Sequence, residues 1–275
     1  MKQTLPSLAA HTQTGRAAMR HKLIFFILCS VQLGASAAST ACPEHYAGGQ
    51  APDIVNVKLA AQTQELCNIG FVVMHSGTSR TPLWSAEHLT RTQVQSAHGV
   101  QRRNAFHPDS RLPRGQRAEL KDYARSGYDR GHMSPSGDMP DASAQLESFA
   151  LSNMVPQNPQ NNRHLWEGIE SAVRQLALQR GELYVITGPL FTGAQLKRIN
   201  RVLVPSHLFK LVFDARRNEA GAYLAANEDT DNYQRVSVNE LEQMAGISLL
   251  PGVPVKVKAV AMTLPQSHPY AGRRR

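Results

Sequence analysis

The chain has 275 residues, of which 41% are hydrophobic and 19% charged, and its formal net charge is +9. This length allows one or two domains. The composition is that of an ordinary globular protein, which excludes a globally disordered chain and a collagen-like or repetitive fibre.

Residues 1–37 have the pattern of a secretory signal peptide. Basic residues precede an apolar run of 11 residues, Leu23–Leu33, and the small residues 35–37 follow it; this order is typical of such signals. The run is too short to span a membrane comfortably, since a spanning helix takes about 20 residues. Met19 opens a compact form of the signal and is a second candidate for the true start. We therefore expect a secreted or periplasmic protein with no stable membrane association after cleavage.

The chain after this signal divides into an N-terminal arm at 38–64, one domain at 65–265 and a basic tail at 266–275. It keeps 26 of the 30 Lys and Arg residues, because four lie in the signal, and all 21 Asp and Glu residues. A mildly basic balance suits a polyanionic partner such as nucleic acid. Ordinary solubility explains the balance equally well, so charge alone assigns no function.

Two cysteines, Cys42 and Cys67, remain after the signal is removed. An even pair in an oxidising compartment predicts a disulfide, which would tie the arm to the start of the domain. The sequence holds no CxxC pair or Cys/His cluster with the spacing of a zinc site.

The domain begins with apolar and β-branched residues at 68–75, which predict a buried strand. Residues 90–128 are rich in Arg, Gln, Pro and Gly without a clean period, so we expect a long loop region with short elements. From 162 to 180 apolar residues recur at intervals of three and four, which predicts a helix that Gly181 ends.

Three further segments have the character of strands, at 183–187, 207–213 and 222–226. Ser237 and Glu240 then form a capping box at the start of a short helix that Gly246 ends. These elements together predict one α+β domain, with a central, mostly antiparallel sheet flanked by helices.

The run Asp129-Arg130-Gly131-His132 combines groups that suit phosphate chemistry. A His can accept a proton from water near neutral pH, and the Arg offers a fixed positive fork for a phosphate. Gly131 allows a close approach of backbone or substrate. An isolated His is more often a surface residue or a hydrogen-bonded core residue, so this tetrapeptide alone does not define a site.

Two further groups of polar residues follow. Asn153 precedes a pair, Asn161 and Asn162, whose amide oxygens are neutral hard ligands that suit Mg²⁺, although Asn is also a common helix cap. Glu170 and Arg174 lie four residues apart and share a helix face. Taken alone, they indicate an ordinary surface ion pair.

Together these residues resemble the active-site signature of the DNA/RNA non-specific endonucleases, a family that includes secreted bacterial nucleases and mitochondrial endonuclease G. The match runs through residues 129–135 and 151–157, and then to Asn162, Trp166 and Glu170. Both the residue types and the gaps between them agree with the family's pattern.

This resemblance covers residues 65–262 and implies a ββα-metal (His-Me finger) nuclease fold. It implies His132 as the general base and Asn162, rather than Asn161, as the direct protein ligand of Mg²⁺, for which Mn²⁺ could substitute. Glu170 is then a ligand through a bridging water.

The resemblance also assigns residues that contact the phosphate or order the site. Arg130 and Arg174 match positions that steady the phosphate or the leaving group, and Asn153 matches a polar position that orients the site. Arg103 stands where the family often has another phosphate-contacting Arg, with Arg102 as a competitor.

The implied activity is hydrolysis of phosphodiester bonds in DNA and RNA. His132 would deprotonate water, Mg²⁺ would stabilise the phosphate and leaving group, and arginines would stabilise developing charge. Contacts to backbone phosphates carry no sequence information, which agrees with low specificity. The alternative is a catalytically silent module of the cell envelope that only binds nucleic acid. The resemblance also allows a homodimer and an inhibitor protein as partners.

Overall fold

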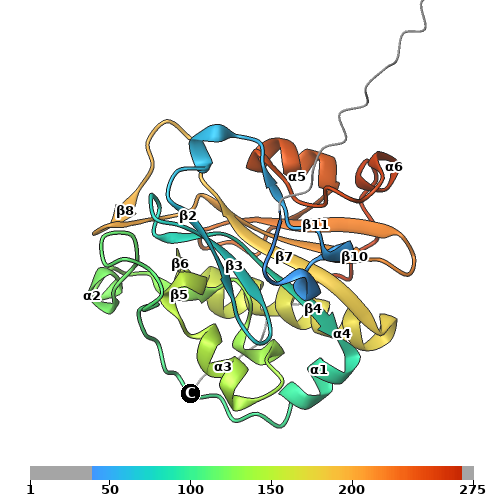
Figure 1. The fold of residues 1–275 in the computed structure, drawn as a ribbon, viewed down its shortest axis with the longest axis horizontal. Coiled ribbons are helices and arrows are strands. Elements are labelled where there is room, and N and C mark those ends of the chain that lie inside the picture. Colours follow the sequence, from blue (N-terminus) through green and yellow to red (C-terminus); the bar gives the residue numbers. More distant parts are fainter. Residues whose placement is uncertain (1–38, 268–275) are drawn as a thin grey trace, which may run out of the picture. The chain divides into compact units, whose positions relative to one another are not determined.

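The computed structural model describes residues 39–267, and a seven-stranded sheet runs through them (Figure 1). The strand order is β12-β11-β10-β7-β4-β3-β2, and every neighbouring pair is antiparallel. The strands are β2 (Thr63–Cys67), β3 (Val72–Ser76), β4 (Thr81–Thr90), β7 (Glu182–Leu190), β10 (His207–Asp214), β11 (Glu219–Ala226) and β12 (Gln234–Val236). The predicted central antiparallel sheet is confirmed.

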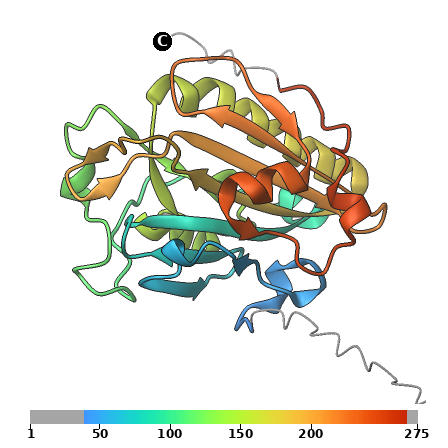
Figure 2. The same cartoon turned by 90° about the horizontal axis from the view of Figure 1, so that it is seen from above.

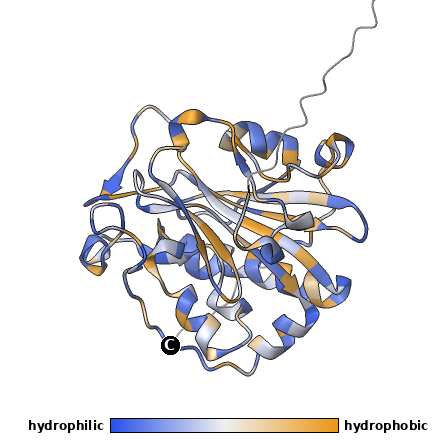
Figure 3. Cartoon of the chain, in the orientation of Figure 1, coloured by the Kyte–Doolittle hydropathy of each residue, from blue (hydrophilic) through white to orange (hydrophobic). Residues whose placement is uncertain are grey.

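Helices cover both faces of this sheet (Figures 1 and 2). α1 (Arg91–Ala97) and α4 (Glu167–Arg180) pack on one face, and α5 (Val238–Ala245) and α6 (Val255–Lys258) pack on the other. The hydropathy colouring shows apolar residues along the central strands between these layers (Figure 3). No helix within residues 39–267 is long and apolar enough to cross a membrane.

Strand β4 contributes side chains to the hydrophobic cores on both faces of the sheet. Successive side chains of a strand point to opposite faces. Trp84 and Ala86 therefore join the core beneath α5 and α6, whereas Leu89 joins the core beneath α1 and α4. Because both faces are covered, β4 lacks the alternation of apolar and polar residues that marks a half-exposed strand, and the sequence pattern does not indicate it.

A two-stranded ribbon lies beside the sheet and leads into α4. β5 (Asp129–His132) pairs antiparallel with β6 (Met154–Gln157), and α3 (Ala142–Ser148) lies between them in the sequence. A π-helical segment, Asn161–Trp166, follows β6 and runs directly into α4. Two strands followed by a helix make up the ββα unit that the sequence resemblance implies.

The remaining elements are short. β1 (Asp53–Ile54) pairs with β13 (Ile247–Ser248), and β8 (Arg198–Ile199) and β9 (Val202–Leu203) form a hairpin near α2 (Leu120–Tyr123). Single 3₁₀ turns cover Pro43–His45, Ala47–Gly49, Val57–Leu59, Ser136–Asp138 and Leu151–Asn153.

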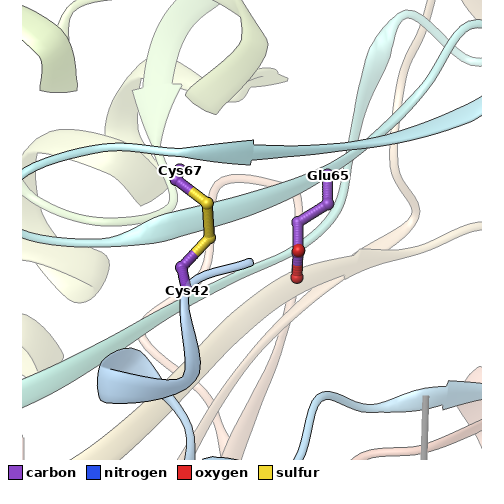
Figure 4. A group of neighbouring side chains, drawn as sticks. All are labelled: Cys42, Glu65 and Cys67. Atoms are coloured by element: carbon purple, nitrogen blue, oxygen red, sulfur yellow. A yellow bond between two sulfur atoms is a disulfide. The ribbon is translucent and has the colours of Figure 1, made fainter. Parts of the chain in front are cut away.

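A disulfide joins Cys42 and Cys67, as the sequence predicts (Figure 4). Cys67 ends β2, one of the two edge strands of the sheet, so the bond fastens the N-terminal arm to that edge. Glu65 strengthens the attachment, because its carboxylate accepts hydrogen bonds from Thr40 Oγ1 at 2.8 Å and from the Ala41 backbone at 3.0 Å.

Two expectations need correction. The strand predicted at 68–75 begins only at Val72, because Asn68 hydrogen-bonds the Phe71 carbonyl and closes the turn between β2 and β3. The helix predicted at 162–180 has its predicted length, but its first turns are π-helical. The capping box of α5 and the left-handed Gly246 that ends it are confirmed. The predicted signal peptide at 1–37 lies outside the described residues, as does most of the basic tail.

Candidate active site

A cavity of about 730 Å³ opens between the β5–β6 ribbon and the start of α4. Most of the residues proposed from the sequence line it: Arg130, His132, Asn162, Glu170 and Arg174. The ribbon supplies the first two and the π-helix with α4 supplies the rest, so the ββα unit brings them together. Arg102, named as a competitor of Arg103, also lines it, as do residues that the sequence did not indicate, among them Phe106, Tyr128 and Glu167.

His132 ends β5, opposite Met154 of β6. Its ring packs edge-on against Phe149, with 5.0 Å between centroids, and lies 5.8 Å from the ring of Phe106. Burial, together with the positive charge of Arg102, lowers the pKa of His132 to about 3. His132 is therefore neutral at neutral pH, and a neutral imidazole can accept a proton.

The Nε2 atom of His132 is buried, and no group among residues 39–267 hydrogen-bonds it. Leaving a buried polar atom unpaired costs free energy, and in native structures such an atom usually has a functional reason. Since His132 lines the cavity, the unpaired nitrogen suits a reacting group or a water that enters the site.

Gly131 permits the two strands of the ribbon to approach closely. A Cβ atom at this position would lie 1.9 Å from Oε1 and 2.6 Å from Cβ of Gln157, which is far inside van der Waals contact. Gln157 in turn donates to Oδ1 of Asn161 at 2.8 Å, and Asn161 donates to the Ala226 carbonyl at 3.0 Å. Asn161 is thus engaged in fixing the start of the π-helix.

Asn162 has a different partner. Its Nδ2 donates to Oδ2 of Asp129 at 2.9 Å, which leaves the amide oxygen as the group available to a cation. Arg163 holds the same carboxylate through two hydrogen bonds of 2.8 and 2.7 Å. Asp129 therefore sets the orientation of the Asn162 amide and is itself fixed by Arg163.

Glu170 lines the cavity and has several charged groups around it. Burial raises its pKa to about 7; Lys210 and Arg174 oppose this effect, while Asp138 and Glu167 add to it. Lys210 is buried on β10 and donates to Thr187 Oγ1 at 2.7 Å. A further positive charge at the cavity would favour the ionised form of Glu170.

Arg174 is anchored from below by Asp138. Its Nη1 donates to Oδ1 of Asp138 at 3.0 Å, and its Nη2 lies 3.7 Å from Oε1 of Glu167. Because Asp138 is only 2% exposed, this ion pair holds the guanidinium in one place at the cavity wall.

The other arginines differ in how they reach the cavity. Arg130 stacks over the Phe106 ring, with its Cζ 4.2 Å from the centroid. Arg102 donates to Ser136 Oγ at 2.8 Å and lines the cavity, whereas Arg103 does not line it. Of these two candidates, the structure therefore places Arg102 at the cavity and Arg103 outside it.

Asn153 lies behind the site and outside the cavity. It is fully buried, its Oδ1 accepts from the Ser134 backbone at 3.0 Å, and its Nδ2 donates to the carbonyls of Ser134 and Ser148. Ser134 Oγ also lies 2.7 Å from Ser85 Oγ of β4. Asn153 therefore orders the chain that follows His132 and ties it to the sheet.

The donor atoms at the cavity fit a hard divalent cation. They are the amide oxygen of Asn162 and the carboxylates of Glu167 and Glu170; Oε2 of Glu167 is buried, with no hydrogen-bond partner among the described residues. Oxygen donors with few protein ligands and several waters suit Mg²⁺.

A metal bound by three or more acidic, Cys or His side chains does not fit this cavity. Within the described part of the chain, Cys42, Glu65 and Cys67 form the only group with ligand atoms that close together, and its sulfurs are joined in the disulfide (Figure 4).

Glu167, which lines the cavity, has a recognisable sequence signal. Glu167 precedes Glu170 by three residues, a spacing that places both on one face of a helix. Phe106 and Tyr128 carry no comparable signal, because their places in the cavity depend on packing between distant segments: Phe106 lies against Phe149, and Tyr128 lies against Lys197.

Comparison with known proteins identifies a family and relatives with similar sequences. Residues 50–256 match the family described as DNA/RNA non-specific endonuclease. A nuclease of Syncephalastrum racemosum is 34% identical over 206 residues, covering 65% of this chain and 64% of that protein. The mitochondrial nuclease EXOG of Danio rerio is 32% identical over 205 residues, covering 66% of this chain and 59% of that protein. The chain therefore spans less than two thirds of the length of either relative.

A solved structure shows the same fold. It is described as the crystal structure of the EndoG/EndoGI complex, concerning the mechanism of EndoG inhibition. It matches with a TM-score of 0.62 and 28% sequence identity, over 70% of this chain and 88% of that chain. The expectation of a ββα-metal nuclease fold is confirmed.

The expectation of a secreted or periplasmic protein is wrong by this comparison. Relatives from Danio rerio, Homo sapiens and Schizosaccharomyces pombe carry the names of mitochondrial nucleases. The expectation rested on residues 1–37, which contain basic and no acidic residues, and mitochondrial targeting segments share that feature.

The family match extends over residues 50–256 and includes every residue of the cavity described above. The chain belongs to the DNA/RNA non-specific endonuclease family.

Proposed function

We propose that the chain is a metal-dependent endonuclease that hydrolyses phosphodiester bonds in DNA and RNA. One observation carries the proposal: the cavity is lined both by a neutral histidine, His132, and by the oxygen ligands Asn162 and Glu170. A general base and a cation site that share a cavity suit the hydrolysis of a phosphodiester by water.

His132 acts as the general base in this proposal. Its unpaired Nε2 accepts a proton from the attacking water, a contribution of about 10²–10⁴ to the rate. The imidazolium that forms is disfavoured by burial and by Arg102. A bound phosphate brings negative charge next to His132, and this charge stabilises the imidazolium.

Cationic side chains bind and orient the phosphate. Arg102, Arg130 and Arg174 line the cavity, and each is held by a neighbour, so their charges are in place before the substrate binds. Such preorganised charge stabilises the transition state without further rearrangement. These contacts reach the phosphate and not the bases, which accounts for cleavage without sequence preference.

The proposed metal is Mg²⁺, with Mn²⁺ as a substitute. Asn162 would bind it directly and Glu170 through a water, and Asp129 would keep the amide oxygen of Asn162 available. When bound, the cation neutralises charge on the phosphate and assists departure of the leaving oxygen.

A catalytically silent binding module is the alternative that the sequence left open. Such a module needs neither an unpaired buried imidazole nitrogen nor a carboxylate whose pKa is raised by burial. Both features cost stability without helping binding, so the geometry favours the enzyme.

The relatives also bear on location and partners. Several relatives carry the names of mitochondrial nucleases, and by analogy we propose a mitochondrial location for this chain. The structural neighbour is a complex that concerns inhibition of EndoG, and by analogy we propose that an inhibitor protein can bind this chain. A homodimer stays a prediction from the family resemblance.

A cleavage assay tests the proposal. Purified protein with Mg²⁺ should degrade plasmid DNA, single-stranded DNA and RNA, and both EDTA and His132→Ala should abolish cleavage. His98→Ala is the matched control, because His98 is exposed and outside the cavity, and it should retain full activity. Folded protein that does not cleave with Mg²⁺ or Mn²⁺ would refute the proposal, and full activity in His132→Ala would refute the assigned base.

A further inference from the structure

The cavity holds only part of a polymeric substrate. At about 730 Å³, it has the size of a site for a small-molecule ligand. A nucleic acid strand cleaved within its length must therefore leave the cavity across an edge. One edge is lined by Tyr123, Arg125 and Tyr128, and the surface beyond it decides whether the strand is bound there.

Beyond this edge, α2 and the β8–β9 hairpin form one body, here called the α2–hairpin lobe (residues 118–128 and 197–204). Arg201 donates two hydrogen bonds, of 3.0 and 2.7 Å, to the carboxylate of Asp122. Asn200 donates to the Asp122 carbonyl at 2.9 Å, and Ile199 packs in one apolar cluster with Tyr123. Both views show the hairpin beside α2 (Figures 1 and 2).

The lobe presents positive charge to solvent because its acidic side chains are already paired. Asp122 is 2% exposed and is bound by Arg201, and Glu119 is bound by Arg117. Four cations stand exposed on the lobe, and no carboxylate of residues 39–267 lies within salt-bridge distance of them: Lys121, Arg125, Lys197 and Arg198.

This charge is continuous with the cavity. Nζ of Lys197 lies 4.9 Å from the centroid of the Tyr128 ring, and Tyr128 lines the cavity. Arg125 both lines the cavity and is exposed. A strand leaving the cavity on this side therefore meets cations at once, and aromatic rings interleaved with cations are typical of surfaces that bind single strands.

We propose that the α2–hairpin lobe binds the backbone phosphates of the nucleic acid next to the cleaved bond. The inference rests on the proposed nuclease function and adds an extended binding surface to it. Lys121, Lys197 and Arg198 hold the polymer without touching the reacting phosphate, so they affect binding of long substrates and not the chemical step.

The test removes these three cations together, as Lys121→Gln/Lys197→Gln/Arg198→Gln; none of the three lines the cavity. We expect KM for duplex DNA to rise about tenfold or more near 0.1 M salt, with kcat nearly unchanged. Each lost phosphate contact lowers the salt slope by roughly 0.9, so the slope of log affinity against log salt should fall by about 2 to 3. Hydrolysis of bis(p-nitrophenyl) phosphate should not change.

The matched control removes three exposed cations from other elements: Lys58→Gln/Lys256→Gln/Arg235→Gln. An equal rise of KM in both triple variants would show that the effect comes from net charge alone, which would overturn the proposal. An unchanged KM in the lobe variant would also overturn it. If the wild type cleaves nothing, the proposed function fails separately. The duplex Kd of the wild type against the lobe variant, measured in EDTA, then still decides whether the lobe binds DNA.

Discussion

Asp129 and Asn162 meet across the cavity wall, with 2.9 Å between Oδ2 of the carboxylate and Nδ2 of the amide. The first lies in the β5 strand and the second in the π-helix, so this hydrogen bond joins the strand part of the ββα unit to its helix. It also distinguishes the two ends of an amide that would otherwise be free to turn. An ionised carboxylate accepts hydrogen bonds but has no proton to donate. The Asn162 amide must therefore turn its nitrogen toward Asp129 and its oxygen toward the cavity.

Removing Asp129 should therefore weaken the metal site. For Asp129→Ala we expect a loss of about 10- to 100-fold in metal affinity or activity, the usual effect of deleting a residue that orients a ligand. The Mg²⁺ concentration needed for half-maximal cleavage measures it. Arg163→Ala is the control: it removes the exposed ion pair with Asp129, worth about 0–1 kcal/mol, but keeps the hydrogen bond to Asn162. If both variants behaved alike, the orienting role of Asp129 would be wrong.

Gly131→Ala should destabilise the ribbon. The added Cβ would overlap Gln157, and the strands must separate to relieve the clash, which we expect to cost about 1–3 kcal/mol. Chemical denaturation measures the loss. Gly115→Ala is the control, because a Cβ at Gly115 meets no atom within 4 Å; if the two variants were equally stable, the close approach at Gly131 would not be required.

His75 should make the protein sensitive to acid. It is 0% exposed, its Nδ1 has no hydrogen-bond partner among the described residues, and burial lowers its pKa. The folded state thus favours the neutral form of His75. Above the unfolded pKa of about 6.5 this preference costs no stability. Below that value the unfolded chain binds a proton that the folded protein excludes, so the free energy of unfolding falls. One such group changes the free energy of unfolding by about 1.4 kcal/mol per pH unit.

In His75→Gln the free energy of unfolding should therefore fall less steeply between pH 6.5 and 5 than in the wild type. Urea unfolding at several pH values measures the slope. His98→Gln, at an exposed position, should keep the wild-type slope. An unchanged slope in His75→Gln would show that this histidine does not control acid stability.

The disulfide should stabilise the N-terminal arm. Cys42 and Cys67 lie 25 residues apart, and closing a loop of this length contributes about 3 kcal/mol by restricting the unfolded chain. Cys42→Ala/Cys67→Ala should lower the thermal midpoint, and reductant should lower it in the wild type but not in the variant. Equal midpoints with and without reductant in the wild type would contradict this role.

The sequence was informative where chemistry and local pattern coincide. The signature around His132 and the spacing from Asn162 to Glu170 identify residues of the cavity, because both the residue types and the gaps between them agree with the family's pattern. The capping box at Ser237 likewise predicts α5, since a cap acts within one turn. These signals depend on neighbours in the chain and need no knowledge of the fold.

Other features depend on contacts between distant segments, and the sequence does not show them. Strand β4 is buried on both faces and carries polar residues such as Ser85 and Glu87 in its interior, so no period marks it. The choice of Arg102 over Arg103 depends on a hydrogen bond to Ser136, 34 residues away. The role of Asp129 depends on a partner 33 residues along the chain.

The π-helical segment Asn161–Trp166 affects how the site depends on spacing. In a regular α-helix each residue turns the side-chain direction by about 100°, so two residues eight apart would point about 80° away from each other. A π-helix has more residues per turn and turns less at each residue, so the directions of Asn162 and Glu170 converge. The π-helical segment thus reduces the angle around the helix axis between the side chains of these two proposed ligands. If these residues formed a regular α-helix instead, the whole signature would remain in the sequence, and Asn162 would still be rotated by about 80° away from Glu170.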